Sequence, residues 1–458
     1  MSPFARRDFL LAAALTPLAS RVAAGGAPVP RPDAPPAAGD AAGYSLAWVR
    51  KYRTGFDLNT CWDGGDLSRY VYTHMTEFFP HACIHRAGPI KELGRGKDPG
   101  VGKVEAVLRP NNPMTGPNKP VTLSLDKYLP RMDAFLVLHK GKIAFEAYPR
   151  MREFDRHIYW SVAKIIASLL VGMLEDEKRI DVTNPVSKYL PELDDSDWKK
   201  IPLVDVLDMA SGIGGLEFDD PKAYTDPDSP YGRYEASLGT MPRRPGNPAS
   251  AHEYVRDLRQ MRDSGEAFEY TSVNTFVLSW VIERVTKQPY AEVVGERIWR
   301  KIGAEADAAI LLGPTGAPAS HGYVSGTLRD LGRLGLAFTP SWRTVCDKPL
   351  VSAAHLAKIQ QGGRPAIFKK LKSLNEVDVL FGAADRPVHN TYQWDYVWAD
   401  GDFFKEGYGG QGLYISPSRD LVVAFFAAGP NPPQDMLKSP VVFARAIAKS
   451  GLFPDFKR

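Results

Sequence analysis

The sequence predicts an α+β fold: a central antiparallel β-sheet flanked by helices, with an all-helical subdomain inserted between its strands. One β-hairpin is expected at residues 134–148, where AFLVL, a turn at His139–Lys142 and IAFEAY follow one another. A second is expected at residues 412–428, where Pro417–Asp420 separates GLYIS from LVVAFFAA, and an amphipathic helix follows at about residues 434–449. Because most segments between the hairpins have helical periodicity, strands from both ends of this region should form one sheet around a helical insert.

The first 43 residues have the composition of an export signal followed by a linker. Residues 1–24 contain the pair Arg6–Arg7, an apolar run and small residues at Ala23–Ala24, which is typical of twin-arginine signal peptides. The apolar run at Phe9–Ala19 is too short to span a bilayer. We therefore expect a periplasmic or secreted protein with no stable membrane insertion after cleavage. Residues 25–43 are rich in Pro, Ala and Gly and should form a flexible linker.

Composition places the chain among ordinary globular proteins. Its 458 residues are 44% hydrophobic and 24% charged, which excludes a disordered or fibrous protein. The formal net charge of +4 is small for this length, so we expect no nucleic-acid partner. The three cysteines form no CxxC pair, which argues against redox and zinc-ribbon functions. Export would make a disulfide between Cys61 and Cys83 possible, with Cys346 left over.

Residues 44–125 form an N-terminal extension whose role the sequence does not indicate. Within it, His81, Cys83 and His85 alternate, and on a β-strand they would point to one face. A metal site is possible there. An ordinary packed or exposed set of side chains is favoured, because a fourth ligand and the flanking spacing of metal sites are missing.

The candidate chemistry begins soon after the first hairpin. Residues 160–174 have the pattern of a mostly apolar helix in which Lys164 is the only ionisable side chain. Ser161 precedes Lys164 by three residues, so on a helix the two side chains share one face. Burial and the helix dipole both disfavour the ammonium form, which lowers the lysine pKa towards that of a usable base. A helix-capping serine beside a snorkelling lysine is the alternative interpretation.

Two further motifs follow along the chain. Tyr270, in FEYTSVNT, stands on a loop just before a predicted helix, where a phenol can relay a proton if a neighbouring amine lowers its pKa. Residues 405–412, KEGYGGQG, open the second hairpin. Their glycines let a substrate approach the strand closely enough for backbone N–H groups to bind an oxyanion.

These motifs, in this order and with these flanking strands, resemble the serine β-lactamase and penicillin-binding-protein superfamily. The resemblance covers residues 126–453 and is greatest to the class C-like branch, which includes carboxylesterases and 6-aminohexanoate oligomer hydrolases. It implies a β-lactamase/transpeptidase-like fold with Ser161 as the acylated nucleophile, Lys164 as its activating amine and Tyr270 as the base that passes the proton to the leaving group. It implies neither a cofactor nor a metal.

The same resemblance implies an oxyanion hole and a set of substrate-binding residues. Tyr408 follows Lys405–Glu406–Gly407 as a residue follows the Lys-Thr-Gly of the family, so the backbone N–H groups of Ser161 and Tyr408 are the expected donors. The register can slip towards Gly410 or Gln411. Trp398 represents an aromatic cluster at 392–398 for which pocket and core are equally good interpretations. The binding candidates are thus Gly407, Tyr408, Gly409, Gly410, Gln411, Ser272, Asn274 and Trp398.

Two departures from the class C pattern bear on the substrate. The chain has Tyr270–Ser272 where the family has Tyr-x-Asn, and Glu406 where it has the hydroxyl residue of Lys-Thr-Gly. A carboxylate facing the pocket would repel the carboxylate of a penicillin, although on an alternating strand Glu406 can instead face solvent. We therefore expect an exported serine hydrolase of small ester, amide or peptide substrates. The alternatives are a D,D-peptidase or D-aminopeptidase, a weak β-lactamase, and a catalytically silent binding protein on the same scaffold. The oligomeric state is not indicated.

Overall fold

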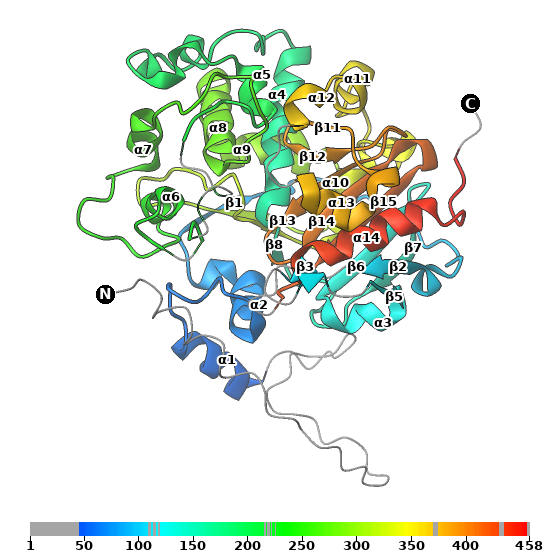
Figure 1. Cartoon of the computed structure of the whole chain (residues 1–458). Coiled ribbons are helices and arrows are strands. Elements are labelled where there is room, and N and C mark those ends of the chain that lie inside the picture. The colour runs from blue at the N-terminus through cyan, green and yellow to red at the C-terminus, as the bar shows by residue number, and fades with distance from the viewer. Residues whose placement is uncertain are drawn as a thin grey trace. The chain divides into compact units, whose positions relative to one another are not determined.

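The computed structural model describes residues 45–108, 111–112, 116–117, 120–214, 217, 220, 222–224, 226–369, 374–429 and 435–455. The expected signal peptide, residues 1–24, and linker, residues 25–43, lie outside them. The described residues form the predicted α+β arrangement, in which a large antiparallel sheet is surrounded by helices (Figure 1).

The central sheet contains seven strands in the order β11-β12-β13-β14-β15-β6-β7, all antiparallel to their neighbours. Both predicted hairpins, β6–β7 and β14–β15, are confirmed, and β15 pairs with β6 to join the two ends of the region in one sheet. The strands are β6 Ala134–His139, β7 Lys142–Ala147, β11 His389–Thr391, β12 Trp394–Val397, β13 Phe403–Gly407, β14 Gln411–Ser416 and β15 Leu421–Phe426.

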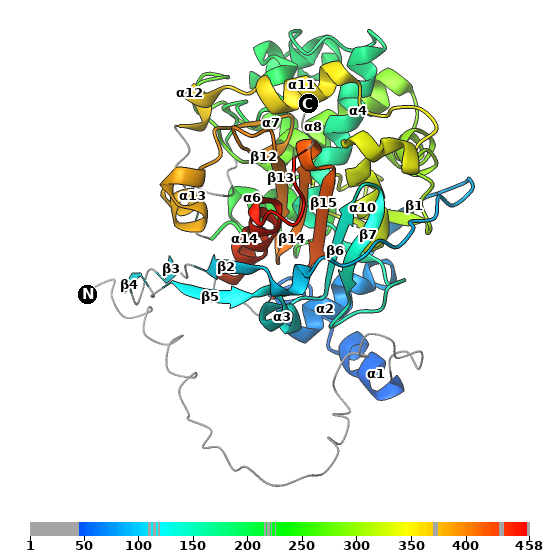
Figure 2. The ribbon, with the colours of Figure 1, turned by 90° about the vertical axis from the view of Figure 1, so that its right-hand side faces the viewer.

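Alternation along the strands gives this sheet two apolar faces. Leu136 and Leu138 of β6 face α10 (Leu328–Leu336), where an added Cβ on Gly332 would lie 2.7 Å from Leu136 Cδ2. Phe135 and its alternating neighbours belong to a separate core that includes α14 (Asp435–Lys449). The two helices therefore cover opposite faces of the sheet (Figure 2).

A second sheet holds the segment that leads to Ser161. Its strand order is β1-β9-β10-β8, with bounds β1 His81–Ile84, β8 His157–Ile158, β9 Ala308–Leu311 and β10 Val324–Gly326. After β8 come the 3₁₀ turn η4 (Trp160–Ala163) and the helix α4 (Lys164–Asp176). The short strands β2 Glu105–Leu108 and β5 Val121–Ser124 form one pair, and β3 Asn111–Asn112 and β4 Gly116–Pro117 form another.

Helices dominate the chain between β8 and β11, as the sequence predicted, and α8 packs against both α4 and α5. The helices and helical turns described in this region, besides η4, α4 and α10, are η5 Val186–Lys188, η6 Pro191–Leu193, η7 Asp197–Lys200, α5 Leu203–Leu207, α6 Pro230–Leu238, α7 Ala251–Asp257, α8 Ser272–Thr286, α9 Tyr290–Val294, the π-helical turn η8 Gly295–Trp299, η9 Pro340–Thr344, α11 Ala353–Gln361, α12 Pro365–Phe368, α13 Leu374–Phe381 and η10 Ala383–Asp385. Between β14 and β15 lies η11 Pro417–Arg419.

The N-terminal extension is tied to the sheets by a buried ion pair. Arg69 Nε lies 2.6 Å from Asp133 Oδ1, and the two side chains are 2% and 0% exposed. The other carboxylate oxygen of Asp133 lies 3.3 Å from His157 Nε2 on β8. Cys61 and Cys83 are free thiols, so the disulfide considered above does not form. The helices and turns of this part are α1 Leu46–Thr54, α2 Gly65–Thr73, η1 Met75–Glu77 and η2 Val101–Lys103, and α3 Leu125–Tyr128 and η3 Leu129–Arg131 follow at its end.

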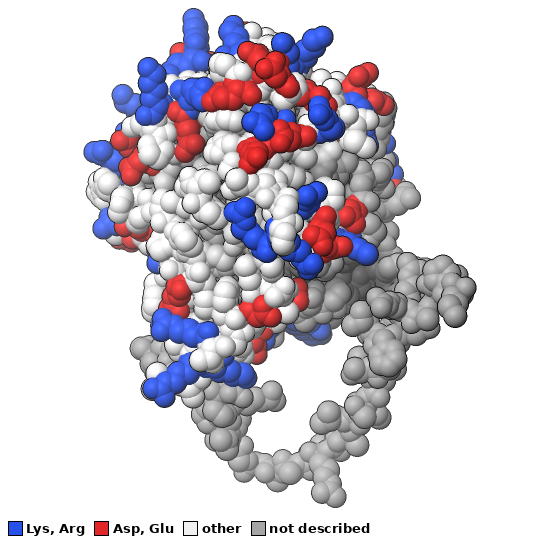
Figure 3. Space-filling model, turned by 90° about the vertical axis from the view of Figure 1, so that its left-hand side faces the viewer, with Lys and Arg blue, Asp and Glu red and all other residues white. Residues whose placement is uncertain are grey.

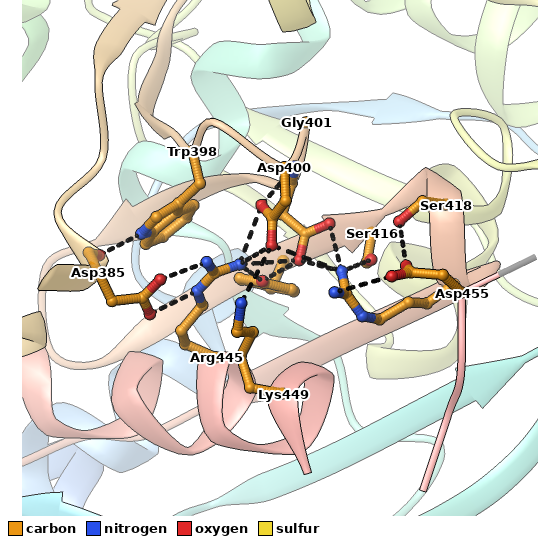
Figure 4. A network of polar contacts seen from close by, with 12 residues as sticks. Asp385, Trp398, Asp400, Gly401, Ser416, Ser418, Arg445, Lys449 and Asp455 are labelled. Carbon is orange, nitrogen blue, oxygen red and sulfur yellow. Dashed lines mark hydrogen bonds and ion pairs between the residues drawn. The ribbon is translucent and has the colours of Figure 1, made fainter. Parts of the chain in front are cut away.

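A charged network joins α14 to the strand ends on its side of the sheet (Figure 4). Arg445 Nη1 lies 2.9 Å from Asp400 Oδ2 and 3.0 Å from Asp402 Oδ2. Its guanidinium carbon lies 4.8 Å from the centre of the Trp398 ring, and Trp398 Nε1 donates to Asp385 O at 2.8 Å. Trp398 therefore belongs to the packing beneath α14.

The described surface carries charges of both signs. Lys and Arg side chains are interspersed with Asp and Glu side chains over the face shown in Figure 3, in keeping with the net charge of +4. Among the helices of the described residues, none combines the length and the apolar composition that crossing a bilayer requires.

Candidate active site

Ser161 lies in a 3₁₀ turn, and α4 begins three residues later. The sequence predicted one continuous helix here. The chain reaches Ser161 through Trp160, whose φ of 46° is rare for a bulky side chain and marks local backbone strain. In a 3₁₀ turn, residues three apart eclipse one another, so Ser161 and Lys164 still face each other.

The amine of Lys164 is buried and contacts three oxygens. Its Nζ lies 3.1 Å from Ser161 Oγ, 3.0 Å from Ser272 Oγ and 2.7 Å from the carbonyl oxygen of His321. Desolvation lowers the pKa of Lys164 to about 7, against the opposing effect of the Glu217 carboxylate. An amine with this pKa is partly neutral at neutral pH and can accept a proton from a hydroxyl group.

Glu217 is a part of the site that sequence reasoning missed. It lies at the N-terminus of α8, where Ser272 donates to it from both its backbone N, at 2.5 Å, and its Oγ, at 2.6 Å. Free N–H groups at a helix N-terminus favour a carboxylate. Burial nevertheless raises the pKa of Glu217 to about 7. Ser272, predicted to bind substrate, thus links Glu217 to Lys164.

Tyr270 lies beside two amines. Its hydroxyl is 3.4 Å from Lys405 Nζ, and its ring centre is 5.0 Å from Lys164 Nζ and 4.6 Å from Lys405 Nζ. Burial raises the pKa of Tyr270 well above its usual value, and a hydrogen bond with Ser161 only partly opposes this. The resting phenol is therefore protonated and can act first as a proton donor.

Lys405 and Asp395 form a buried pair behind Tyr270. Lys405 Nζ lies 2.5 Å from Asp395 Oδ1, and the other carboxylate oxygen accepts from the backbone N of Glu406 at 2.9 Å. In the sequence, Lys405 was noted only as the first residue of the motif 405–412, and no role was predicted for Lys405 or Asp395. A lysine in an apolar strand was the available signal, because lysines are rarely buried without a partner. Glu406 follows Lys405 on the alternating strand, so its side chain leaves β13 on the opposite face.

The end of β13 lies directly against the turn that carries Ser161. A Cβ added to Gly407 would lie 2.8 Å from the carbonyl oxygen of Tyr159 and 3.1 Å from Trp160 Cβ. The ring of Tyr408 contacts that of Trp160 edge-on at 5.3 Å and stacks on Tyr224 at 5.4 Å. Gly407 thus allows the end of β13 to approach the turn that carries Ser161.

The next three candidates shape the turn between β13 and β14. Gly409 and Gly410 adopt φ values of 87° and 99°, in the left-handed region that favours glycine. Gln411 is buried, and its Nε2 donates to the carbonyl oxygen of Ala427 at 2.6 Å. These residues therefore hold the hairpin in place, and the Gln411 side chain points to neighbouring backbone.

Two predicted binding residues lie elsewhere. Asn274 is buried in the first turn of α8, where its Nδ2 lies 3.6 Å from Met209 Sδ. Trp398 packs against Arg445 beneath α14, as described above. Asn274 points from α8 into the core, and Trp398 lies on the face of the central sheet that α14 covers. Neither side chain therefore lines the cavity beside Ser161.

The cavity beside Ser161 combines aromatic rings with carboxylates. The N-terminal extension contributes Trp62 and Asp63 to its wall, which gives residues 44–125 a place in the site. Trp62 is held by a hydrogen bond from its Nε1 to the carbonyl oxygen of Thr240 at 2.7 Å. Glu406 is not among the described lining residues, which are Trp62, Asp63, Trp160, Ser161, Glu217, Tyr224, Tyr231, Glu235, Met241, His321, Gly322, Tyr323 and Tyr408.

Comparison with known proteins agrees with this arrangement. Residues 130–444 match the family model described as Beta-lactamase. The chain belongs to the β-lactamase family. This family member is a hydrolase related to a 6-aminohexanoate-dimer hydrolase of Paenarthrobacter ureafaciens, with 31% identity over 378 residues, 81% of this chain and 88% of the relative. It is also 27% identical, over 37% of its length and 39% of the relative, to a teichoic acid D-alanine hydrolase of Staphylococcus aureus.

The fold of this β-lactamase family member is also similar to those of solved structures. A Bacillus anthracis protein named as a 6-aminohexanoate-dimer hydrolase superposes with a TM-score of 0.66 at 22% identity, covering 85% of this chain and 95% of the other. EstCE1, a hydrolase with promiscuous acyltransferase activity, superposes with a TM-score of 0.52 at 14% identity, covering 70% and 95%. At these identities the likeness shows the fold.

Proposed function

We propose that this β-lactamase family hydrolase cleaves ester or short amide bonds through an acyl-enzyme on Ser161. The contact between Ser161 Oγ and the buried amine of Lys164, at 3.1 Å, carries the proposal. A hydroxyl group is a weak nucleophile until a neighbouring base takes its proton. Lys164, with its pKa lowered to about 7, is such a base at neutral pH.

The proposed reaction has two halves. Ser161 Oγ attacks the substrate carbonyl carbon while Lys164 takes its proton, and the backbone N–H groups of Ser161 and Tyr408 bind the oxyanion that forms. Each such donor contributes about 3 kcal/mol of transition-state stabilisation. The phenol of Tyr270 then gives its proton to the departing oxygen or nitrogen. Water attacks the acyl-enzyme by the reverse path and releases the acid.

This scheme revises the role that the resemblance implied for Tyr270. Its raised pKa favours a protonated phenol at rest, so Tyr270 is proposed as the donor to the leaving group. Lys405, 3.4 Å from its oxygen, stabilises the phenolate that remains after this transfer. In deacylation this phenolate takes a proton from the attacking water, and the ammonium of Lys164 returns its proton to Ser161 Oγ, which restores the resting site.

The cavity favours uncharged or basic substrates. Its wall contains the carboxyl groups of Asp63, Glu217 and Glu235, so a substrate carboxylate would face like charges. The Glu406 carboxylate, a possible source of the same repulsion, is not among the described residues that line the cavity. The relative named for the 6-aminohexanoate dimer supports only the acyl side of this class, because that dimer is an amide whose acyl half carries an amino group and whose leaving half ends in a carboxylate. The twin-arginine pattern of residues 1–24 supports action outside the cytoplasm.

Hydrolysis of a panel of p-nitrophenyl esters and short amides tests the proposal. Wild-type protein should release product, and Ser161→Ala should lose at least about a thousandfold in kcat/KM. Hydrolysis that is absent in both proteins, without any adduct on Ser161, would support a silent binding protein. Durable labelling of Ser161 by fluorescent penicillin, with poor ester hydrolysis, would support a D,D-peptidase.

A further inference from the structure

A second cluster of reactive side chains lies at the edge of the four-stranded sheet. Cys83 is on the edge strand β1, His85 follows two residues later, and Asp307 lies directly before the neighbouring strand β9. Strand pairing of Ile84 with Ala308 brings His85 alongside Asp307. The sequence interpretation favoured an ordinary set of side chains here because a further ligand was missing. Asp307 supplies one from 222 residues beyond His85.

The donor atoms of the three side chains converge on one point. Cys83 Sγ lies 3.4 Å from His85 Nδ1 and 3.6 Å from Asp307 Oδ2, and those two atoms lie 3.2 Å apart. In a tetrahedral zinc site with bonds of ~2.0–2.3 Å, such ligand pairs are about 3.3–3.6 Å apart. The triangle of atoms therefore matches one face of a zinc tetrahedron within about 0.2 Å, the tolerance for such sites.

The same geometry argues against a thiol nucleophile. A cysteine activated by a histidine needs one ring nitrogen for the thiol and the other for the orienting carboxylate. Here Cys83 and Asp307 both approach Nδ1 of His85. One nitrogen cannot serve both partners in a proton relay, whereas a metal ion at the centre of the triangle would bind all three donors.

We propose that Cys83, His85 and Asp307 form a zinc-binding site with solvent in the fourth position. Sulfur, imidazole nitrogen and carboxylate oxygen together suit zinc better than calcium or magnesium. The backbone N of Arg86 donates to Asp307 Oδ1 at 2.9 Å, which orients Oδ2 towards the other two donors. The side chains of His85 and Asp307 are 62% and 42% exposed, so an ion can reach the site from solvent.

Bound zinc would fasten the edge strand β1 to β9. Its double positive charge balances a thiolate and a carboxylate, and the ion links two segments that otherwise meet through strand pairing. Because the ion binds the folded chain, it should raise the melting temperature in proportion to the logarithm of its concentration. The site shares no residue with the Ser161 cavity, so this proposal stands or falls independently of the hydrolase proposal.

Metal titration of the full-length chain tests the site. The protein is stripped with a chelator and kept reduced without added thiols, and Co²⁺ is then titrated while the cobalt–thiolate absorption is recorded. Zn²⁺ is added next, and its stoichiometry is measured against a colorimetric chelator. The variants are Cys83→Ser and Asp307→Asn. His81→Asn is the matched control, because His81 is on the same strand but its Nδ1 lies 3.1 Å from the carbonyl oxygen of Phe79. Circular dichroism checks the fold of each variant.

The expected result is one zinc ion per chain and a cobalt–thiolate band that zinc abolishes. Cys83→Ser should lose the band, Asp307→Asn should bind at least about tenfold more weakly, and His81→Asn should behave as wild type. Absence of the band in the folded wild-type protein would overturn the proposal. Zinc binding that persists unchanged in Cys83→Ser, or that is lost in His81→Asn, would overturn the assigned ligands.

Discussion

Replacing Glu217 with glutamine should move the acidic limb of the pH–rate profile to lower pH. The amine of Lys164 must be neutral to accept the proton of Ser161, so kcat/KM should rise as the pH passes the pKa of Lys164, about 7. The Glu217 carboxylate stabilises the ammonium form and raises that pKa. Glu217→Gln removes this charge and keeps the shape of the side chain, so it should lower the pKa of Lys164. The acidic limb of the kcat/KM profile should then move to lower pH by the same amount.

The geometry sets the size of this shift. Lys164 Nζ and Glu217 Oε1 both contact Ser272 Oγ, at 3.0 and 2.6 Å, so they are no more than about 6 Å apart. Unit charges at ~6 Å attract by about 3 kcal/mol at an effective dielectric of ~20, which corresponds to about two pKa units. Because Glu217 is itself only partly ionised near pH 7, we expect a shift of one to about two units.

Initial rates with a p-nitrophenyl ester, measured from about pH 5 to 9, give the profile. Asp228→Asn is the matched control, because it neutralises an exposed carboxylate that pairs with Arg244 on the surface. Its limb should stay where the wild-type limb lies. A Glu217→Gln limb that does not move, or that moves to higher pH, would refute the assignment of Lys164 as the base that Glu217 tunes.

Three further predictions concern the rest of the site. Tyr270→Phe should slow amine release from a short amide by about 10²- to 10⁴-fold because it removes the proton donor to a poor leaving group, and an unchanged rate of amine release would contradict that role. Gly407→Ala should lower kcat at least about tenfold, since its Cβ would lie 2.8 Å from the carbonyl oxygen of Tyr159 and displace β13 from the Ser161 turn. Wild-type turnover in the folded variant would show that this contact does not position the oxyanion donors. Asp395→Ala should lower the free energy of unfolding by about 3–5 kcal/mol, because it leaves the buried ammonium of Lys405 without its carboxylate. A denaturant titration measures this, and a loss below about 1 kcal/mol would count against a buried ion pair.

Local pattern explains what the sequence predicted of the fold. The short apolar runs AFLVL and LVVAFFAA indicated strands because each lies next to a turn, and the turns at 139–142 and 417–420 indicated which segments pair. The approach to Ser161 differed in detail. Periodicity suggested a helix from residue 160, but Trp160 has a φ of 46° and residues 160–163 form a 3₁₀ turn, so the α-helix begins at Lys164.

The site shows where local pattern stops. The spacing of Ser161 and Lys164 predicts their contact, because three residues make about one turn. Contacts between distant segments leave no such signal: Ser272 and Glu217 are 55 residues apart, and Lys405 and Tyr270 are 135 apart. The alternating aromatic residues at 392–398 were compatible with either a pocket or a core. The structure decides for Trp398, which packs in the core beneath α14, on the other face of the sheet.

The most direct test of the central claim is peptide mass mapping of protein quenched in acid during turnover of an activated ester. The proposed mechanism predicts one acyl group on the peptide that contains Ser161, and none on the same peptide from Ser161→Ala. An acyl group on a different residue, or turnover that continues in Ser161→Ala at the wild-type rate, would contradict it.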